Sequence, residues 1–182
     1  MLLPALMMAL LLTGCGDAVP EGRLKERKEE LNAAREIRVS ADVTANLENE
    51  VFSCSLDCTS TPEETVVEVT APESIAGIRA AVDLEGTRIE YEDVSLGVGG
   101  DTAPSPVTFL PLLLQGLREG SLLRSWTERE EGRSLIVRES YVTDDSSLRV
   151  WLDEKTLTPV WAELQQGGKV LLRCEIREFA FE

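Results

Sequence analysis

Alternation of apolar and polar side chains, repeated along most of the chain, is the feature that most constrains how this sequence can fold. The segment IRVSADVTA places Ile37, Val39, Ala41 and Val43 on one side of an extended chain and polar residues on the other. A period of two is typical of a strand with one buried face. Similar runs recur at intervals of about ten residues, bounded by turns such as the Gly-Gly of LQQGGKV. The sequence therefore predicts an antiparallel meander that curves toward a barrel.

One segment, SPVTFLPLLLQGLREG (residues 105–120), has a helical pattern instead. Ser105 is a good N-cap, Pro106 a good first residue, and Gly120 can close the far end. Pro111 removes one internal hydrogen bond, so we expect a kink or a second start there.

The apolar residues of this helix cover nearly its whole circumference, which predicts burial on more than one side. We therefore expect it to lie inside the curve of the sheet, as a lid over a hydrophobic groove or as a filling of that groove. The fold class that follows is mainly β (α+β): a curved antiparallel sheet forming an unclosed barrel of about ten strands with a buried apolar helix. The candidate groove or lid residues are Phe109, Leu110, Leu113, Leu114 and Leu117.

The N-terminus carries a second signal. An apolar run without charge ends at Leu12-Thr13-Gly14-Cys15, which suits a signal peptide and is short for a membrane-spanning helix. These four residues resemble the lipobox of bacterial lipoproteins, which implies cleavage after Gly14 and a diacylglycerol on the thiol of Cys15. The alternative, a buried N-terminal helix with an incidental cysteine, leaves the abrupt change to Gly16-Asp17 unexplained.

Three segments follow from these patterns. Residues 1–14 are the expected lipoprotein signal peptide. Residues 15–35 are a lipidated tether followed by a short amphipathic helix that we expect to pack weakly. Residues 36–182 are the barrel domain.

Charge and composition exclude several function classes. The net charge of −15 argues against nucleic acid and against a polybasic grip on anionic lipids. Membrane attachment should then come from the acyl chains on Cys15, at the extracytoplasmic face of the cell membrane. Histidine is absent, which removes the commonest general base and zinc ligand. With no catalytic motif, we expect no enzyme activity, no cofactor and no metal; nothing indicates an oligomeric state.

Three cysteines remain after Cys15. Cys54 and Cys58 lie four residues apart on one expected strand, roughly 13 Å, which is too far for a disulfide unless the strand is broken. Cys174 could pair with either of them, or all three could be small buried hydrophobic residues.

The tryptophans at 126, 151 and 161 stand at the polar positions of their runs, so parity places them on the outer face of the sheet. Trp151 and Trp161 lie at similar distances from the turn between them, and we expect them to be cross-strand neighbours. With Arg149 they would form an aromatic, cation-bearing surface for a partner. The alternative is a second packed layer covered by the N-terminal helix.

The C-terminal segment LRVWLDEKTLTPVWAELQQGGKVLLRCEIREFAFE resembles the closing hairpins of the Lol-type lipoprotein carriers. VEVTAPESIAGI, with Pro72 to Ile78, resembles that family's strand, proline and short-helix passage. The resembling positions in the closing segment are Asp153, Thr156, Pro159, Gly167, Gly168, Phe179 and Phe181.

This resemblance implies an unclosed barrel with a helical lid. The lipobox suits the lipid-anchored branch, which includes germination lipoproteins of endospore-forming bacteria that work with a cortex-modifying amidase. We therefore expect a non-enzymatic, membrane-anchored binding or scaffolding lipoprotein with a protein partner. The alternative is a carrier or acceptor of lipids or lipoproteins, with the hydrophobic ligand in its groove.

Overall fold

The computed structural model describes residues 21–47, 50–83, 86–91, 94–98 and 105–182. The expected signal peptide (1–14) and Cys15 lie outside these residues. The two helices are α1 (Glu21–Ala33) and α2 (Pro106–Arg118). The strands are β1 (Ile37–Leu47), β2 (Glu50–Ser60), β3 (Thr65–Ala71), β4 (Arg79–Asp83), β5 (Gly86–Tyr91), β6 (Val94–Val98), β7 (Leu122–Glu130), β8 (Arg133–Tyr141), β9 (Ser146–Asp153), β10 (Pro159–Gln166) and β11 (Lys169–Phe181).

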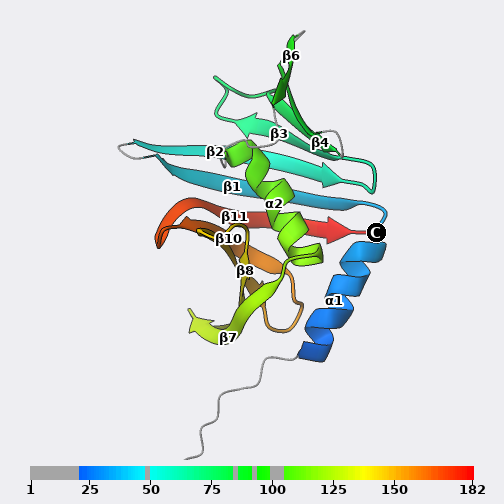
Figure 1. Cartoon of the computed structure of the whole chain (residues 1–182), viewed down its shortest axis with the longest axis vertical. Coiled ribbons are helices and arrows are strands. Elements are labelled where there is room, and N and C mark those ends of the chain that lie inside the picture. The colour runs from blue at the N-terminus through cyan, green and yellow to red at the C-terminus, as the bar shows by residue number, and fades with distance from the viewer. Residues whose placement is uncertain (1–20, 48–49, 84–85, 92–93, 99–104) are drawn as a thin grey trace, which may run out of the picture.

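All eleven strands belong to one sheet, in the order β6-β5-β4-β3-β2-β1-β11-β10-β9-β8-β7. Each strand pairs antiparallel with its neighbours, and the first and last strands of the chain meet at the centre, with Ile37 opposite Phe181. β6 and β7 are the two edges, and the chain passes from one to the other through α2 (Figure 1). The predicted unclosed antiparallel barrel is confirmed, with eleven strands among the described residues in place of about ten.

The alternation predicted for the first strand is also confirmed. Val39, Ala41 and Val43 are buried in β1, whereas Asp42 between them is exposed. The buried residues belong to the main hydrophobic core, which lies between the sheet and the two helices.

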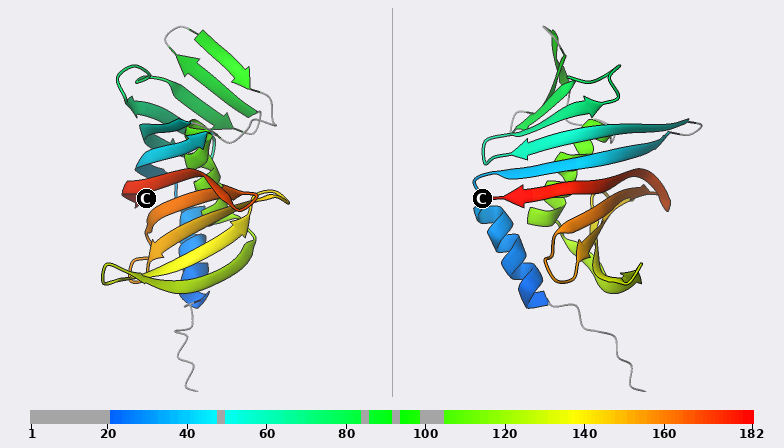
Figure 2. Two further views of the ribbon diagram at one scale, coloured as in Figure 1. Left: turned by 90° about the vertical axis from the view of Figure 1, so that its left-hand side faces the viewer. Right: turned by 180° about the vertical axis from the view of Figure 1, so that it is seen from behind.

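α2 crosses the strands on one face of the curved sheet, which we call the inner face (Figures 1 and 2). The backbone N–H of Ser105 donates to Thr108 Oγ1 at 3.0 Å where the helix begins. The helix then runs without a break through Pro111, so the predicted second start does not occur. Burial of Phe109, Leu110 and Leu113 in the main core holds the turn that lacks one hydrogen bond.

α1 is held more firmly than its sparse apolar stripe predicts. Leu24 and Leu31 are buried in the main core. Arg23 Nη1 donates to the Glu154 carbonyl at 3.1 Å, and Arg118 Nε of α2 donates to the Leu31 carbonyl at 3.3 Å. These bonds tie α1 to the β9–β10 loop and to α2, so it forms part of the domain. Neither α1 nor α2 is long and apolar enough to span a membrane, and these are the helices of the described residues.

Truncating a side chain of α2 to alanine should destabilise the domain in proportion to how deeply that side chain is buried. Leu113 is fully buried, so Leu113→Ala should lower the free energy of unfolding by about 2–5 kcal/mol, because it removes apolar contacts and leaves a cavity. Leu112→Ala, one residue away at a half-buried position, is the matched control and should cost clearly less. Urea denaturation followed by far-UV circular dichroism measures both; equal losses would contradict the filled inner face.

Candidate functional site

The predicted groove and lid residues all lie in α2 and all face protein. Phe109, Leu110 and Leu113 have no exposed surface, and Leu114 and Leu117 are nearly as buried. They pack into the main core together with inner-face residues such as Leu56 and Leu164. Of the two arrangements expected for this helix, the structure has the filled one beneath these five residues.

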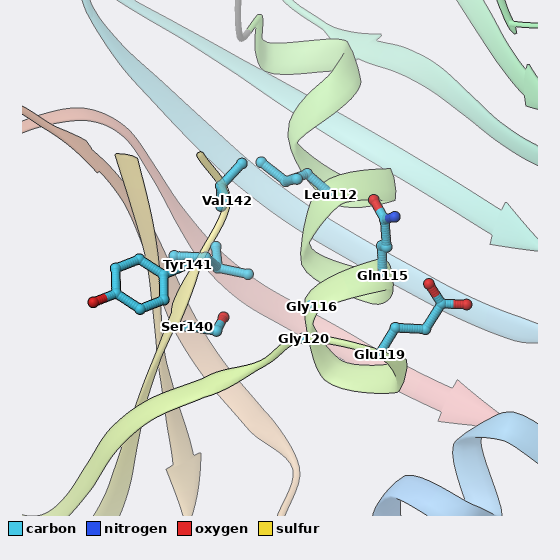
Figure 3. Close-up of a pocket in the computed structure, with 9 residues that line it drawn as sticks. Leu112, Gln115, Gly116, Glu119, Gly120, Ser140, Tyr141 and Val142 are labelled. Carbon is cyan, nitrogen blue, oxygen red and sulfur yellow. The ribbon is translucent and has the colours of Figure 1, made fainter. Parts of the chain in front are cut away.

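A pocket of about 290 Å³ remains beside the C-terminal half of α2 (Figure 3). It lies between α2 and the ends of β8 and β9. Its lining comprises Leu112, Gln115, Gly116, Glu119 and Gly120 from the helix and its end, and Ser140, Tyr141, Val142 and Leu148 from the strands and their connection. None of these residues was a sequence-derived candidate.

Two glycines shape this side of the helix. A Cβ on Gly116 would lie 2.4 Å from Cδ2 of Leu148, and a Cβ on Gly120 would lie 2.4 Å from the carbonyl oxygen of Gly116. Glycine at 116 lets the helix approach Leu148 of β9 closely, and glycine at 120 lets the chain leave the helix close to its own backbone. The signal in the sequence was a glycine inside an otherwise apolar helix, which often marks close backbone packing.

The pocket lining is amphiphilic. Leu112, Val142 and Leu148 provide apolar surface, whereas Gln115 and Glu119 provide polar groups. The volume is close to the lower end of the range for small-molecule pockets, about 300–1,000 Å³. Such a lining suits a molecule with one apolar and one polar part.

The opposite, outer face of the sheet carries the three tryptophans. Trp161 is the cross-strand partner of Trp151, as predicted, and their stacked rings have centroids 5.3 Å apart. With Leu135 and Val137 of β8 they form a second hydrophobic cluster, separate from the main core.

Six planar side chains line up through this cluster, and we call them the tryptophan–arginine series. Arg124 lies over Trp126, with its guanidinium carbon 5.0 Å from the ring centroid. Arg149 lies over Trp126 at 5.5 Å and over Trp151 at 5.8 Å. Trp151 stacks on Trp161, and Arg173 lies over Trp161 at 5.9 Å. The series joins β7, β9, β10 and β11.

Two carboxylates hold the series in place. Glu128 accepts hydrogen bonds from Nε1 of both Trp126 and Trp151, at 2.7 and 2.8 Å. Glu139 is buried and pairs with Arg124 and Arg149. Burial raises the pKa of Glu139, but hydrogen bonds from Arg124 and Ser147 and the charges of both arginines outweigh it and hold the pKa below its usual range. The indole N–H groups of Trp126 and Trp151 are therefore already engaged within the protein.

The expected partner surface of Trp151, Trp161 and Arg149 thus has a different character. Trp151 is 6% exposed, and Trp161 and Arg149 are half-buried. The N-terminal helix is not what covers them, because the buried side chains of α1 belong to the main core on the inner face. The tryptophans lie on the outer face, as parity predicts, and neighbouring side chains of the same sheet cover them.

The three cysteines of the described residues are buried free thiols. Cys54 and Cys174 lie on either side of Val43, and Cys58 lies further along β2. Burial raises the pKa of Cys54 to about 11 and the pKa values of Cys58 and Cys174 to about 12. They therefore pack as neutral thiols. Within the described ranges, no group of side chains is placed to hold a metal ion.

Comparison with known proteins identifies a fold. No protein-family model matches the chain, and no curated protein sequence matches it either. A DUF1329 family protein from Desulfovibrio piger is similar, with a TM-score of 0.54 and 12% identity over 90% of this chain and 93% of that one. A putative outer membrane lipoprotein-sorting protein domain from Vibrio parahaemolyticus has a TM-score of 0.53 and 10% identity, over 88% and 91%.

An uncharacterized conserved protein from Thermus thermophilus adds a third similar structure, with a TM-score of 0.52 and 12% identity over 89% of this chain and 87% of that one. Identities this low show the fold alone. The resemblance found in the closing hairpins is confirmed at that level: the chain has a Lol-type unclosed-barrel fold.

Replacing the central ring of the series tests whether it is core. Trp151→Ala should lower the free energy of unfolding by about 3 kcal/mol or more, because the ring is buried and its N–H bonds Glu128. Tyr91→Ala, at a ring that is 43% exposed on β5, is the control and should cost much less. Thermal melts of both variants provide the comparison; an unchanged melting temperature for Trp151→Ala would restore the partner-surface interpretation.

Proposed function

We propose that this protein is a non-enzymatic lipoprotein of the cell envelope, anchored through an acylated Cys15, that holds the apolar chain of a lipid or lipoprotein beside α2. The observation that carries the proposal is the amphiphilic pocket between the C-terminal half of α2 and the ends of β8 and β9. Its apolar surface suits a hydrocarbon chain, and its polar rim suits the group at the end of that chain.

The filled core beneath α2 limits what the pocket can take. Phe109, Leu110 and Leu113 occupy the concavity under the helix, so the pocket has room for part of a chain. A longer chain needs α2 to move away from β8 and β9 and expose the leucines that it now buries. A ligand that covers those leucines would recover the apolar burial that this movement loses.

The chemistry of the described residues favours binding over catalysis. The cysteine thiols are neutral and buried, and the buried carboxylate of Glu139 is paired with two arginines. Histidine is absent from the sequence. These observations support a protein that holds its ligand without changing it.

The proposed location depends on the lipobox Leu12-Thr13-Gly14-Cys15. The fold similarity to an outer membrane lipoprotein-sorting protein domain supports the same compartment. With a net charge of −15, the domain would be repelled by an anionic membrane surface and held above it by the acylated tether.

A second candidate is a scaffold for a protein partner, such as the cortex-modifying enzyme that germination lipoproteins support. The edge strands favour it: Val94 and Leu96 of β6 and Leu122 and Leu123 of β7 are 42–62% exposed. An unpaired edge with apolar side chains can accept a strand from another chain. The filled core beneath α2 is compatible with this use, since such a partner would not enter the barrel.

Removing the acylated thiol tests the anchor. Cys15→Ala should release the protein from the membrane fraction or leave it unprocessed, because the acyl chains supply the attachment. Membrane fractionation and the mass of the intact protein measure both effects. Substitution of Cys54, a buried thiol in β2, is the control and should leave fractionation unchanged. A Cys15→Ala protein that fractionates and migrates like wild type would contradict the lipobox interpretation.

Blocking the pocket tests the carrier function. Native mass spectrometry of protein extracted from membranes should show an apolar ligand at about one per chain. Ser140→Leu, which places a larger side chain in the pocket, should reduce that ligand several-fold. Thr59→Leu, at an exposed position of β2, should retain it. Wild-type protein without any bound lipid or acyl chain would overturn the carrier proposal and favour the scaffold.

A further inference from the structure

Arg138 lies one step along β8 from the pocket, on the same face of the sheet. Alternation places it between Ile136 and Ser140 on the inner face. Ile136 is fully buried in the main core, and Ser140 lines the pocket. Alternate residues of a strand are roughly 7 Å apart, so Arg138 is the next residue on this face beyond Ser140, at the border of the pocket lining.

The guanidinium has no partner within the protein. Its Nε is buried and makes no hydrogen bond, and no ion pair or hydrogen bond joins Arg138 to another of the described residues. Its cross-strand neighbours are Ser125 on β7 and Val150 on β9, which carry no charge. Burial lowers the pKa of Arg138, but an arginine stays protonated in proteins. Its Nε is therefore buried without a hydrogen-bond partner, in a side chain that is partly exposed.

A shortage of acidic residues does not explain why Arg138 has no ion-pair partner. The chain has 33 acidic and 18 basic residues, and on the outer face Arg124, Arg149 and Arg173 all reach a carboxylate. A buried polar atom in a protein normally has a hydrogen-bond partner, because an unpaired one loses its hydration without return. On the face where the proposed ligand would lie, Arg138 has a buried Nε with no such partner and makes no ion pair with the described residues.

We propose that Arg138 binds the anionic head group, a carboxylate or a phosphate, of the amphiphile whose chain lies in the pocket beside α2. This inference rests on the proposed carrier function and names its ligand class as anionic amphiphiles. The planar fork of a guanidinium matches both head groups, because each offers two oxygens to parallel N–H donors. Ser140, next on the same face, offers a hydroxyl to the same head group.

Photoactivatable probes of equal chain length test this with the full-length lipidated protein in phosphatidylcholine nanodiscs. One probe is a diazirine fatty acid, the second the corresponding alkyl phosphate, and the third the corresponding neutral alcohol. Intact mass spectrometry measures the fraction of protein labelled. We expect at least one anionic probe to label wild type roughly tenfold more than the alcohol, since a charge-assisted hydrogen bond is worth about that ratio. Labelled peptides should contain residues 112–120 or 140–148.

Arg138→Gln should lower labelling by the anionic probes to the level of the alcohol. Arg133→Gln removes the same charge at an exposed position of the same strand and should label like wild type. A stronger signal from the fatty acid identifies a carboxylate ligand, and a stronger signal from the alkyl phosphate identifies a phosphate ligand. If Arg138→Gln does not fold, Arg138→Lys keeps the charge and should keep the preference for anionic probes.

The wild-type measurement alone can reject the inference. Equal labelling by all three probes would show that the protein does not distinguish anionic from neutral head groups. That result would overturn the role of Arg138 while leaving the carrier function in place. No labelling by any probe would overturn the carrier function itself, and the head-group inference with it.

Discussion

Burial of α2 against the inner face of the sheet is the interaction on which the rest of the structure depends. The helix connects β6 to β7, the two strands that would have to pair to close the barrel. Its apolar side chains fill the concavity, and each fully buried one contributes about 1.5–3 kcal/mol of apolar transfer. The helix occupies the concavity, and the sheet is open, with β6 and β7 as its two edges. α1 extends the same core, because its buried leucines join it and Arg118 of α2 bonds its backbone.

The outer face is held by different physical chemistry. There the tryptophan–arginine series replaces a second layer of secondary structure. Stacking and cation–π contacts join four strands, Glu128 accepts from two of the indoles, and Glu139 pairs with two of the arginines. The outer face of β7 to β11 is thereby partly covered, which leaves the pocket beside α2 and the edges of the sheet for binding.

The proposed function depends on where packing is incomplete. Beneath the first two turns of α2 the core is closed, whereas a pocket remains between the C-terminal half of the helix and the ends of β8 and β9. Arg138, the preceding residue on the same face of β8, adds a buried Nε without a hydrogen-bond partner. An apolar chain and an anionic group would satisfy both features at once, and the acylated tether would keep the domain beside its lipid source.

By itself the sequence determined the local structure and much of the architecture. Periods of two predicted the strands, and the caps at Ser105 and Gly120 predicted α2. The turn before Pro159 predicted the pairing of Trp151 with Trp161. These signals act between residues that are near neighbours in the sequence. Only the tertiary structure decided what depends on contacts between distant segments. It placed α2 in the concavity and packed α1 on the inner face, away from the tryptophans. It also placed Glu128 and Glu139 among the arginines of the outer face, and left Arg138 without an ion-pair partner beside the pocket. Those outcomes depend on which side chains meet across the sheet, and no local pattern encodes the distance between them.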